Sequence, residues 1–100
     1  MDRNDYQNAF LQYIANMQER RVEVTLGEHK LYDHEDCEKI RELLLDATHG
    51  MICDIMVMID GYSSFTSDKM DIINTKTGQR LKTDPFIELH DHVCDFIKYE

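Results

Sequence analysis

Apolar residues near the N-terminus recur at steps of three and four along the chain. Five of them fall on one helical face: Tyr6, Phe10, Leu11, Ile14 and Met17. Asn4 or Asp5 precedes this run and is a suitable N-cap, because a short polar side chain accepts a hydrogen bond from a free amide of the first turn. The pattern therefore predicts a helix that begins near residue 5.

The hydrophobic period changes after this predicted helix. Val22, Val24 and Leu26 alternate with polar residues, which is typical of a strand with one buried face. Gly27 and Glu28 then predict a turn. Leu31 and Tyr32 follow this turn. They fit a return strand and a segment that packs before the next helix equally well.

A second helix is predicted from the acidic segment 33–36, whose carboxylates complement the positive end of a helix dipole. Its apolar positions keep helical spacing on both sides of Gly50: Ile40, Leu43, Leu44, Ala47, Met51, Ile52, Ile55, Met58, Ile59 and Tyr62. Either the helix continues through Gly50, at a cost of about 1 kcal/mol, or it ends there and residues 51–59 form a buried strand. Asp54 fits a buried strand poorly, so the helix is favoured.

The last third of the chain predicts a hairpin and a final helix. Residues 60–64 are rich in turn formers, residues 69–74 and 79–82 are typical of two short strands, and Gly78 lies in the loop between them. Asp84 and Pro85 predict the cap and first position of a helix. Its apolar face is formed by Phe86, Leu89, Val93, Phe96 and Ile97.

These elements predict an α+β fold, with three or four helices packed on a small antiparallel sheet that contains a β-hairpin near residues 69–82. The chain has 100 residues and no linker, repeat or low-complexity tract, so a single domain spanning residues 1–100 is expected. This length excludes a two-domain enzyme.

The charge is strongly negative, with 20 acidic against 11 basic residues and a formal net charge of −9. Such a surface repels phosphate backbones and anionic lipids, so neither direct nucleic-acid binding nor membrane binding is expected. The sequence has no long uncharged apolar stretch and no signal-peptide pattern, and its three cysteines are widely spaced. We therefore expect a cytoplasmic protein with free thiols.

Two surfaces are candidates for binding a partner. Glu88, Asp91 and Asp95 recur on one side of the predicted last helix and would form an acidic ridge. The methionine-rich run 51–58 is apolar over more of the helix than one core face requires. Neighbouring helices are expected to cover that excess, and the alternative is a homodimer through residues 51–62 or an adaptable groove for a partner. Tyr62 and Phe65 are the candidate aromatic anchors beside this run.

Metal and catalytic chemistry have fewer candidates. His34, Cys37, His90 and Cys94 form two His/Cys pairs that would have to converge to bind zinc, and the short Cys-x2-Cys spacing is absent. Asp54 and Asp60 flank an apolar run, but no phosphate-binding loop, Gly-x-Ser-x-Gly or His-Glu-x-x-His motif occurs. We expect no cofactor and no enzymatic activity.

The resulting functional hypothesis is a non-enzymatic, acidic protein-binding module, an inhibitor or immunity-type protein that occludes a basic surface of a partner protein. Focused negative potential would speed its encounter with such a partner. Two alternatives remain open. The acidic surface would mimic nucleic acid and block a DNA- or RNA-binding protein, or the His/Cys pairs would form a metal-binding regulatory domain.

Overall fold

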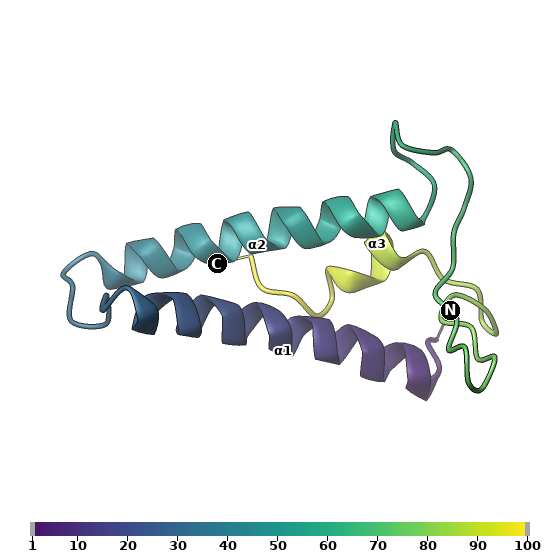
Figure 1. Ribbon diagram of the computed structural model, residues 1–100, viewed down its shortest axis with the longest axis horizontal. Helices are drawn as coiled ribbons and strands as arrows, with labels where there is room; N and C mark the ends of the chain where they lie inside the picture. Colours follow the sequence, from purple (N-terminus) through teal and green to yellow (C-terminus); the bar gives the residue numbers. More distant parts are fainter. Residues whose placement is uncertain (1, 100) are drawn as a thin grey trace.

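The computed structural model describes residues 2–99 and consists of a long helical hairpin closed by the C-terminal part of the chain (Figure 1). Helix α1 spans Asp5–Glu28 and helix α2 spans Cys37–Ile59. The short helix α3 spans Leu89–Val93 and lies between the long helices, which diverge away from their connection (Figure 1). The molecule is elongated, with extents of 47 × 29 × 26 Å.

The predicted start of α1 is confirmed, whereas the predicted strand that follows it is wrong. Asn4 is the N-cap, and its side chain accepts from the Gln7 amide while the Gln7 side chain accepts from the Asn4 amide. The helix then continues through residues 22–26. Val22 and Leu26 are buried, whereas Val24 is exposed. The buried residues are four apart and so follow the helical period, although a five-residue stretch also matches strand alternation.

Helix α2 confirms the interpretation of a helix that continues through Gly50, and the strand alternative for residues 51–59 is wrong. The helix begins at Cys37 with Asp36 as its N-cap residue, several positions later than the acidic segment predicted. Residues 29–36 instead form the connection between the long helices, which starts with a left-handed Lys30 at a φ of 55°.

The prediction of an α+β fold is wrong, because the described residues contain no sheet and the architecture is helical. Residues 69–82 do reverse direction, and Gly78 has the positive φ of 77° expected in that turn. The only bridge described there joins Ile73 to Arg80. Ile72 and Ile73 are both exposed, so the segment lacks the buried face that stabilises paired strands.

The last helix begins at Leu89 rather than Pro85. Asp84 has a φ of 54°, outside the extended region that an N-cap adopts, and Glu88 takes the N-cap position instead. Three of the five predicted core residues are buried: Leu89, Val93 and Ile97. Phe86 lies in the preceding loop and is exposed.

Two buried glutamines of α1 attach the C-terminal half of the chain to the hairpin. The Gln7 Nε2 donates to the carbonyl oxygens of Leu81 at 3.0 Å and Pro85 at 2.7 Å. Gln18 is hydrogen-bonded to both backbone groups of Lys98. Between these attachments lies the larger core cluster: Leu11, Ala15, Met56, Leu81, Ile87, Leu89, Val93 and Ile97. The C-terminal segment therefore fills one side of the diverging hairpin.

Candidate functional site

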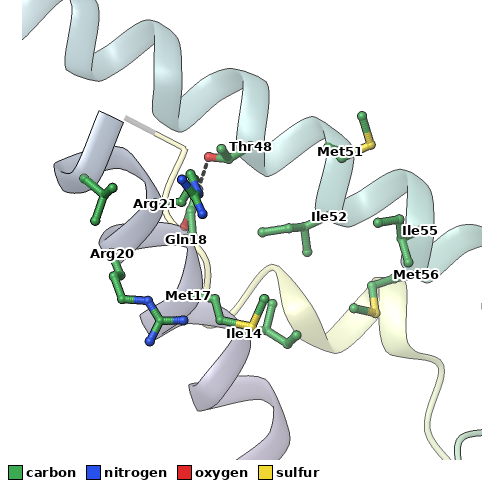
Figure 2. A pocket seen from close by; sticks show the side chains of 11 residues that line it. Ile14, Met17, Gln18, Arg20, Arg21, Thr48, Met51, Ile52, Ile55 and Met56 are labelled. Atoms are coloured by element: carbon green, nitrogen blue, oxygen red, sulfur yellow. Dashed lines mark hydrogen bonds between the residues drawn. The ribbon is translucent and has the colours of Figure 1, made fainter. Parts of the chain in front are cut away.

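An apolar groove of about 350 Å³ lies between α1 and α2 (Figure 2). Ile14, Met17 and Val24 contribute to its α1 wall, and Ile52 and Ile55 to its α2 wall. Gln18 and Met56 are buried and also line it. The groove follows from the sequence pattern, because each long helix carries apolar residues beyond the stripe that packs in the core.

Several large apolar side chains of this groove reach solvent. Met51 is 62% exposed, Ile55 42% and Met17 41%. The expectation that neighbouring helices cover the methionine-rich run is therefore wrong for Met51 and Ile55, although it holds for Met56, which is buried. Tyr13, Val24 and Leu43 are further exposed apolar residues of the two long helices. The two long helices therefore carry a set of large apolar side chains that the described part of the chain does not cover.

The α1 side of the groove carries two adjacent cations, Arg20 and Arg21 (Figure 2). Within residues 2–99, neither guanidinium forms a salt bridge. The remaining wall residues are apolar or uncharged. The groove therefore combines an apolar floor with a positive edge on a molecule whose net charge is negative.

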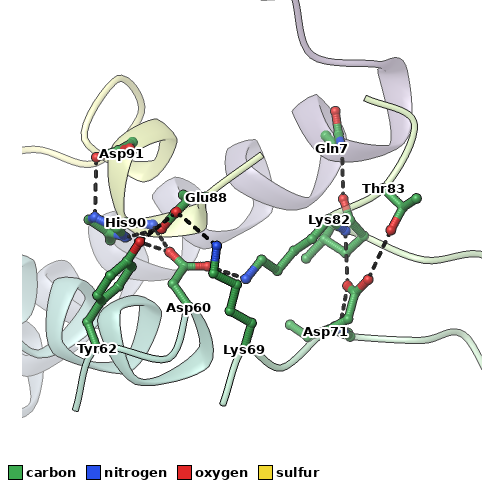
Figure 3. A network of polar contacts seen from close by, with 12 residues as sticks. Gln7, Asp60, Tyr62, Lys69, Asp71, Lys82, Thr83, Glu88, His90 and Asp91 are labelled. Atoms are coloured by element: carbon green, nitrogen blue, oxygen red, sulfur yellow. Dashed lines mark hydrogen bonds and ion pairs between the residues drawn. The ribbon is translucent and has the colours of Figure 1, made fainter. Parts of the chain in front are cut away.

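A buried ionic network lies at the end of α2 (Figure 3). Asp60 follows the last residue of α2, and its side chain is fully buried. Its Oδ1 lies 2.5 Å from the Nζ of Lys82, which is itself 2% exposed. Its Oδ2 accepts from the backbone N–H of His90 at 2.8 Å and lies 2.6 Å from the His90 Nδ1. Asp60 thus links three parts of the chain: the end of α2, the loop between α2 and α3 that carries Lys82, and α3 itself.

The pKa of Asp60 reflects two opposed influences. Burial raises it, but hydrogen bonds from the His90 backbone, the Lys82 ammonium and the His90 ring hold it below the ordinary value of 3.8. The ionised carboxylate is therefore the stable form in the fold. The ionised Asp60 carboxylate therefore holds the segments of Lys82 and His90 together, and it is a poor general acid because it carries no proton.

Acid should destabilise the fold through this carboxylate. Because the native pKa is lowered, the contribution of Asp60 to stability is complete above the ordinary pKa of 3.8 and is lost as the pH falls through the native value. We expect the urea midpoint to fall as the pH is lowered from about 4 toward about 2. Asp91→Asn is the control, since the side chain of Asp91 is 69% exposed and its removal should leave that slope unchanged. If Asp60→Asn leaves the pH dependence of the urea midpoint unchanged, Asp60 is not the carboxylate responsible for the loss of stability in acid.

The predicted acidic ridge does not form as a row of free carboxylates. Glu88 is largely buried and accepts from the Tyr62 hydroxyl at 2.8 Å. Asp95 pairs with Arg3 at 2.9 Å. Asp91 alone of the three has no lysine or arginine partner in the described part of the chain, and only the His90 ring lies near it, at 3.3 Å.

The two predicted aromatic anchors lie near each other in sequence but differ in their contacts. Tyr62 is held by Glu88 and packs edge-on against the His90 ring, with centroids 5.3 Å apart. Phe65 is 75% exposed in the loop that follows α2. Of the predicted binding residues, Phe65 and Asp91 are thus the most available to a partner.

The four predicted metal ligands are not brought together. His34 lies in the connection between the long helices and Cys37 packs beside it in a small core cluster, whereas His90 and Cys94 belong to the α3 region (Figure 1). Within residues 2–99 the potential ligand groups are different ones, His49 with Cys53 and Cys94, and Asp60 with Glu88 and His90. In the second group, Asp60 is already paired with Lys82.

The thiol of Cys53 is poorly suited to nucleophilic chemistry. Burial, the neighbouring Cys94 and the charge of Asp54 raise its pKa to about 11. A thiol with such a pKa is almost entirely protonated at neutral pH, and the thiolate is the reactive form.

Sequence reasoning did not identify His49, Cys53 or Lys82 as site residues. The spacing of His49 and Cys53, one helical turn apart, was a usable signal once α2 is taken as continuous. Lys82 gave no such signal, because it lies in a predicted edge strand where lysines are normally exposed. Asp60 was noticed only as a possible partner of Asp54, which is exposed and does not join its network.

The geometry defines a two-helix hairpin, braced by its C-terminal segment, with an open apolar groove. No protein-family model, no curated protein and no solved structure matches this chain. Among the described residues, no helix combines the length and apolar character needed to cross a membrane.

Proposed function

We propose that this protein is a non-enzymatic protein-binding module that receives an amphipathic helix of a partner protein in the groove between α1 and α2. The observation that carries the proposal is the exposure of Met51, Ile55 and Met17 along one continuous groove. Large apolar side chains that remain exposed in a groove are typical of helix-binding surfaces, and methionines adapt to the shape of the ligand.

The dimensions of the groove fit a short helix. Its α1 wall runs from Ile14 to Val24, which is about 15 Å or nearly three helical turns. A helix of that length presents apolar anchors at positions i, i+3 or i+4, and i+7. These anchors of the bound helix would cover the exposed apolar residues on both walls of the groove.

The charge at the edge favours acidic residues on the bound helix. Arg20 and Arg21 lie beside the apolar wall without a salt-bridge partner among residues 2–99. The net charge of −9 opposes an acidic ligand at long range. Screening at physiological ionic strength acts over about 8 Å, so contacts at the edge outweigh distant acids once the helix is bound.

The chemistry of the other clusters supports a role without catalysis, in the cytoplasm. The thiol of Cys53 has a raised pKa. The carboxylate of Asp60 is committed to Lys82 and His90. All three cysteines are free thiols, as suits a reducing compartment.

A pair of synthetic helical peptides tests this proposal. Both carry leucines at i, i+3 and i+7, and they differ only in having glutamate or lysine on the flank that faces Arg20 and Arg21. We expect fluorescence anisotropy to show tighter binding of the glutamate peptide. Ile55→Asp should weaken binding by about tenfold or more, because a buried anchor contributes about 2 kcal/mol. Arg20→Glu with Arg21→Glu should reverse the peptide preference.

Phe65→Ser is the matched control, because it removes an exposed apolar residue outside the groove and should leave peptide affinity unchanged. Failure of both peptides to bind, or equal binding to Ile55→Asp, would refute the groove as a helix site. Sedimentation of the free protein adds a further outcome. If the free protein is a dimer and Ile55→Asp makes it monomeric, a second copy of the chain covers the groove. That result would refute the proposal that a partner helix binds there.

A second candidate follows from Phe65. Its 75% exposure next to Tyr62 gives the loop after α2 an aromatic contact, and Asp91 supplies an available carboxylate. Each of these exposed side chains suits the inhibitor expected from the sequence, which occludes a basic partner. With an identified basic partner, loss of affinity in Phe65→Ser but not in Ile55→Asp would select this candidate over the groove.

A further inference from the structure

We propose that His49, Cys53 and Cys94 form a zinc-binding site that fastens the end of α3 to α2. The three residues bring one nitrogen and two sulfur ligand atoms to within 4.8 Å of one another. His49 and Cys53 lie one turn apart on α2, and Cys94 directly follows α3. This site is independent of the apolar groove and goes beyond the proposed protein-binding function.

Two of the three separations between the ligand atoms are close to the edges of a zinc tetrahedron. The Sγ atoms of Cys53 and Cys94 are 4.0 Å apart, and the Cys53 Sγ is 3.8 Å from the His49 Nδ1. Zinc bonds of about 2.3 Å to sulfur and about 2.0 Å to nitrogen in a tetrahedron imply separations of about 3.8 Å and about 3.5 Å. Both separations that involve Cys53 are therefore within a few tenths of an ångström of the tetrahedral values, and the ligand atoms of His49 and Cys94 lie within 4.8 Å of each other.

The chemical character of the ligands favours zinc over harder cations. Two thiolates and an imidazole suit a borderline-soft ion, whereas magnesium and calcium prefer oxygen ligands. The ring of Tyr99 packs edge-on against His49 with centroids 5.0 Å apart and limits the rotation of the imidazole. Cys94 is exposed, so solvent supplies the fourth ligand.

Binding would exchange protons for metal. The two thiols lose their protons as the Zn–S bonds form, and the neutral imidazole donates its lone pair, so each zinc releases about two protons at neutral pH. No oxidation or reduction is involved. The metal would bind the folded chain by linking residues about 40 positions apart, and would thereby hold α3 in place.

Cobalt substitution provides the test, with full-length protein purified without a histidine tag and kept reduced by a phosphine. We expect about one Co²⁺ per chain, a thiolate-to-cobalt charge-transfer band, and displacement of that band by Zn²⁺ with release of cobalt. Zinc added to metal-free protein in weak buffer should release about two protons per chain. Absence of the band in the unaltered protein would overturn the proposal.

Single substitutions assign the ligands. Cys53→Ser, Cys94→Ser and His49→Ala should each abolish or greatly weaken the band, whereas Cys37→Ser and His34→Ala should leave it unchanged. Cys94 is exposed, so its substitution preserves the fold and keeps the test valid even if another variant unfolds. Persistence of the band in Cys94→Ser, or its loss in Cys37→Ser, would assign the thiolates elsewhere and refute the site.

Discussion

Replacing Lys82 with Met is expected to lower the free energy of unfolding by about 3 kcal/mol at neutral pH. The substitution keeps the length of the side chain but leaves the fully buried carboxylate of Asp60 without its ammonium partner. Breaking a buried ion pair costs more than the pair itself contributes, because one charge remains desolvated. Urea unfolding monitored by circular dichroism measures the loss, which is a large share of the stability of a domain of this size.

The matched control is Lys98→Met, which breaks an exposed pair with Glu19 at 2.7 Å. Exposed pairs contribute about 1 kcal/mol or less, so the two lysine substitutions should differ several-fold in effect. Combining Lys82→Met with Asp60→Leu should recover part of the lost stability, since no charge then remains buried. Equal losses for Lys82→Met and Lys98→Met would show that the buried pair has no special role.

Replacing Gln18 with Leu is expected to destabilise the protein by about 2 kcal/mol and to release the end of the chain. The Gln18 Nε2 donates to the carbonyl oxygens of Lys98 at 2.6 Å and Leu45 at 3.3 Å, and to the Thr48 hydroxyl at 3.1 Å. Its Oε1 accepts from the Lys98 amide at 2.7 Å. Leucine preserves the volume but leaves the backbone N–H and C=O of Lys98 without their glutamine partner.

Hydrogen exchange distinguishes this effect from a general loss of stability. The amides of residues 94–98 should exchange faster in Gln18→Leu, while those in the middle of α1 keep most of their protection. Gln12→Leu is the control, because Gln12 is exposed and bonds only to Asn16 at 3.1 Å. Its effect should stay within about 0.5 kcal/mol. Unchanged exchange at residues 94–98 would show that Gln18 does not anchor the C-terminal segment.

The errors in the predicted fold have a common physical origin. A strand was expected at residues 22–26 because five residues are too few to separate a period of two from a period of four. The hairpin at residues 69–82 was expected from turn chemistry, and the turn at Gly78 exists. Its flanks do not become strands, because Ile72 and Ile73 gain no buried face that would stabilise the pairing.

The candidate sites were predicted less completely than the helices. The sequence showed the excess apolar character of residues 51–58 but predicted that neighbouring helices cover it, whereas Met51 and Ile55 are exposed in the groove. The ridge does not form because the helix that would display it has only five residues, and because Glu88 and Asp95 are paired with Tyr62 and Arg3. The predicted metal quartet does not form because His34 and Cys37 lie at the connection between α1 and α2, whereas His90 and Cys94 lie in the α3 region.

The sequence by itself predicted the start of α1 near residue 5 and favoured an α2 that continues through Gly50, since capping and amphipathic periodicity act between residues at most four positions apart. Only the tertiary structure decided that Lys82 is buried against Asp60 and that Cys94 meets Cys53. Those contacts join residues that are far apart in the chain. They depend on how the C-terminal segment fills the space between the diverging helices, and local residue patterns do not encode that packing.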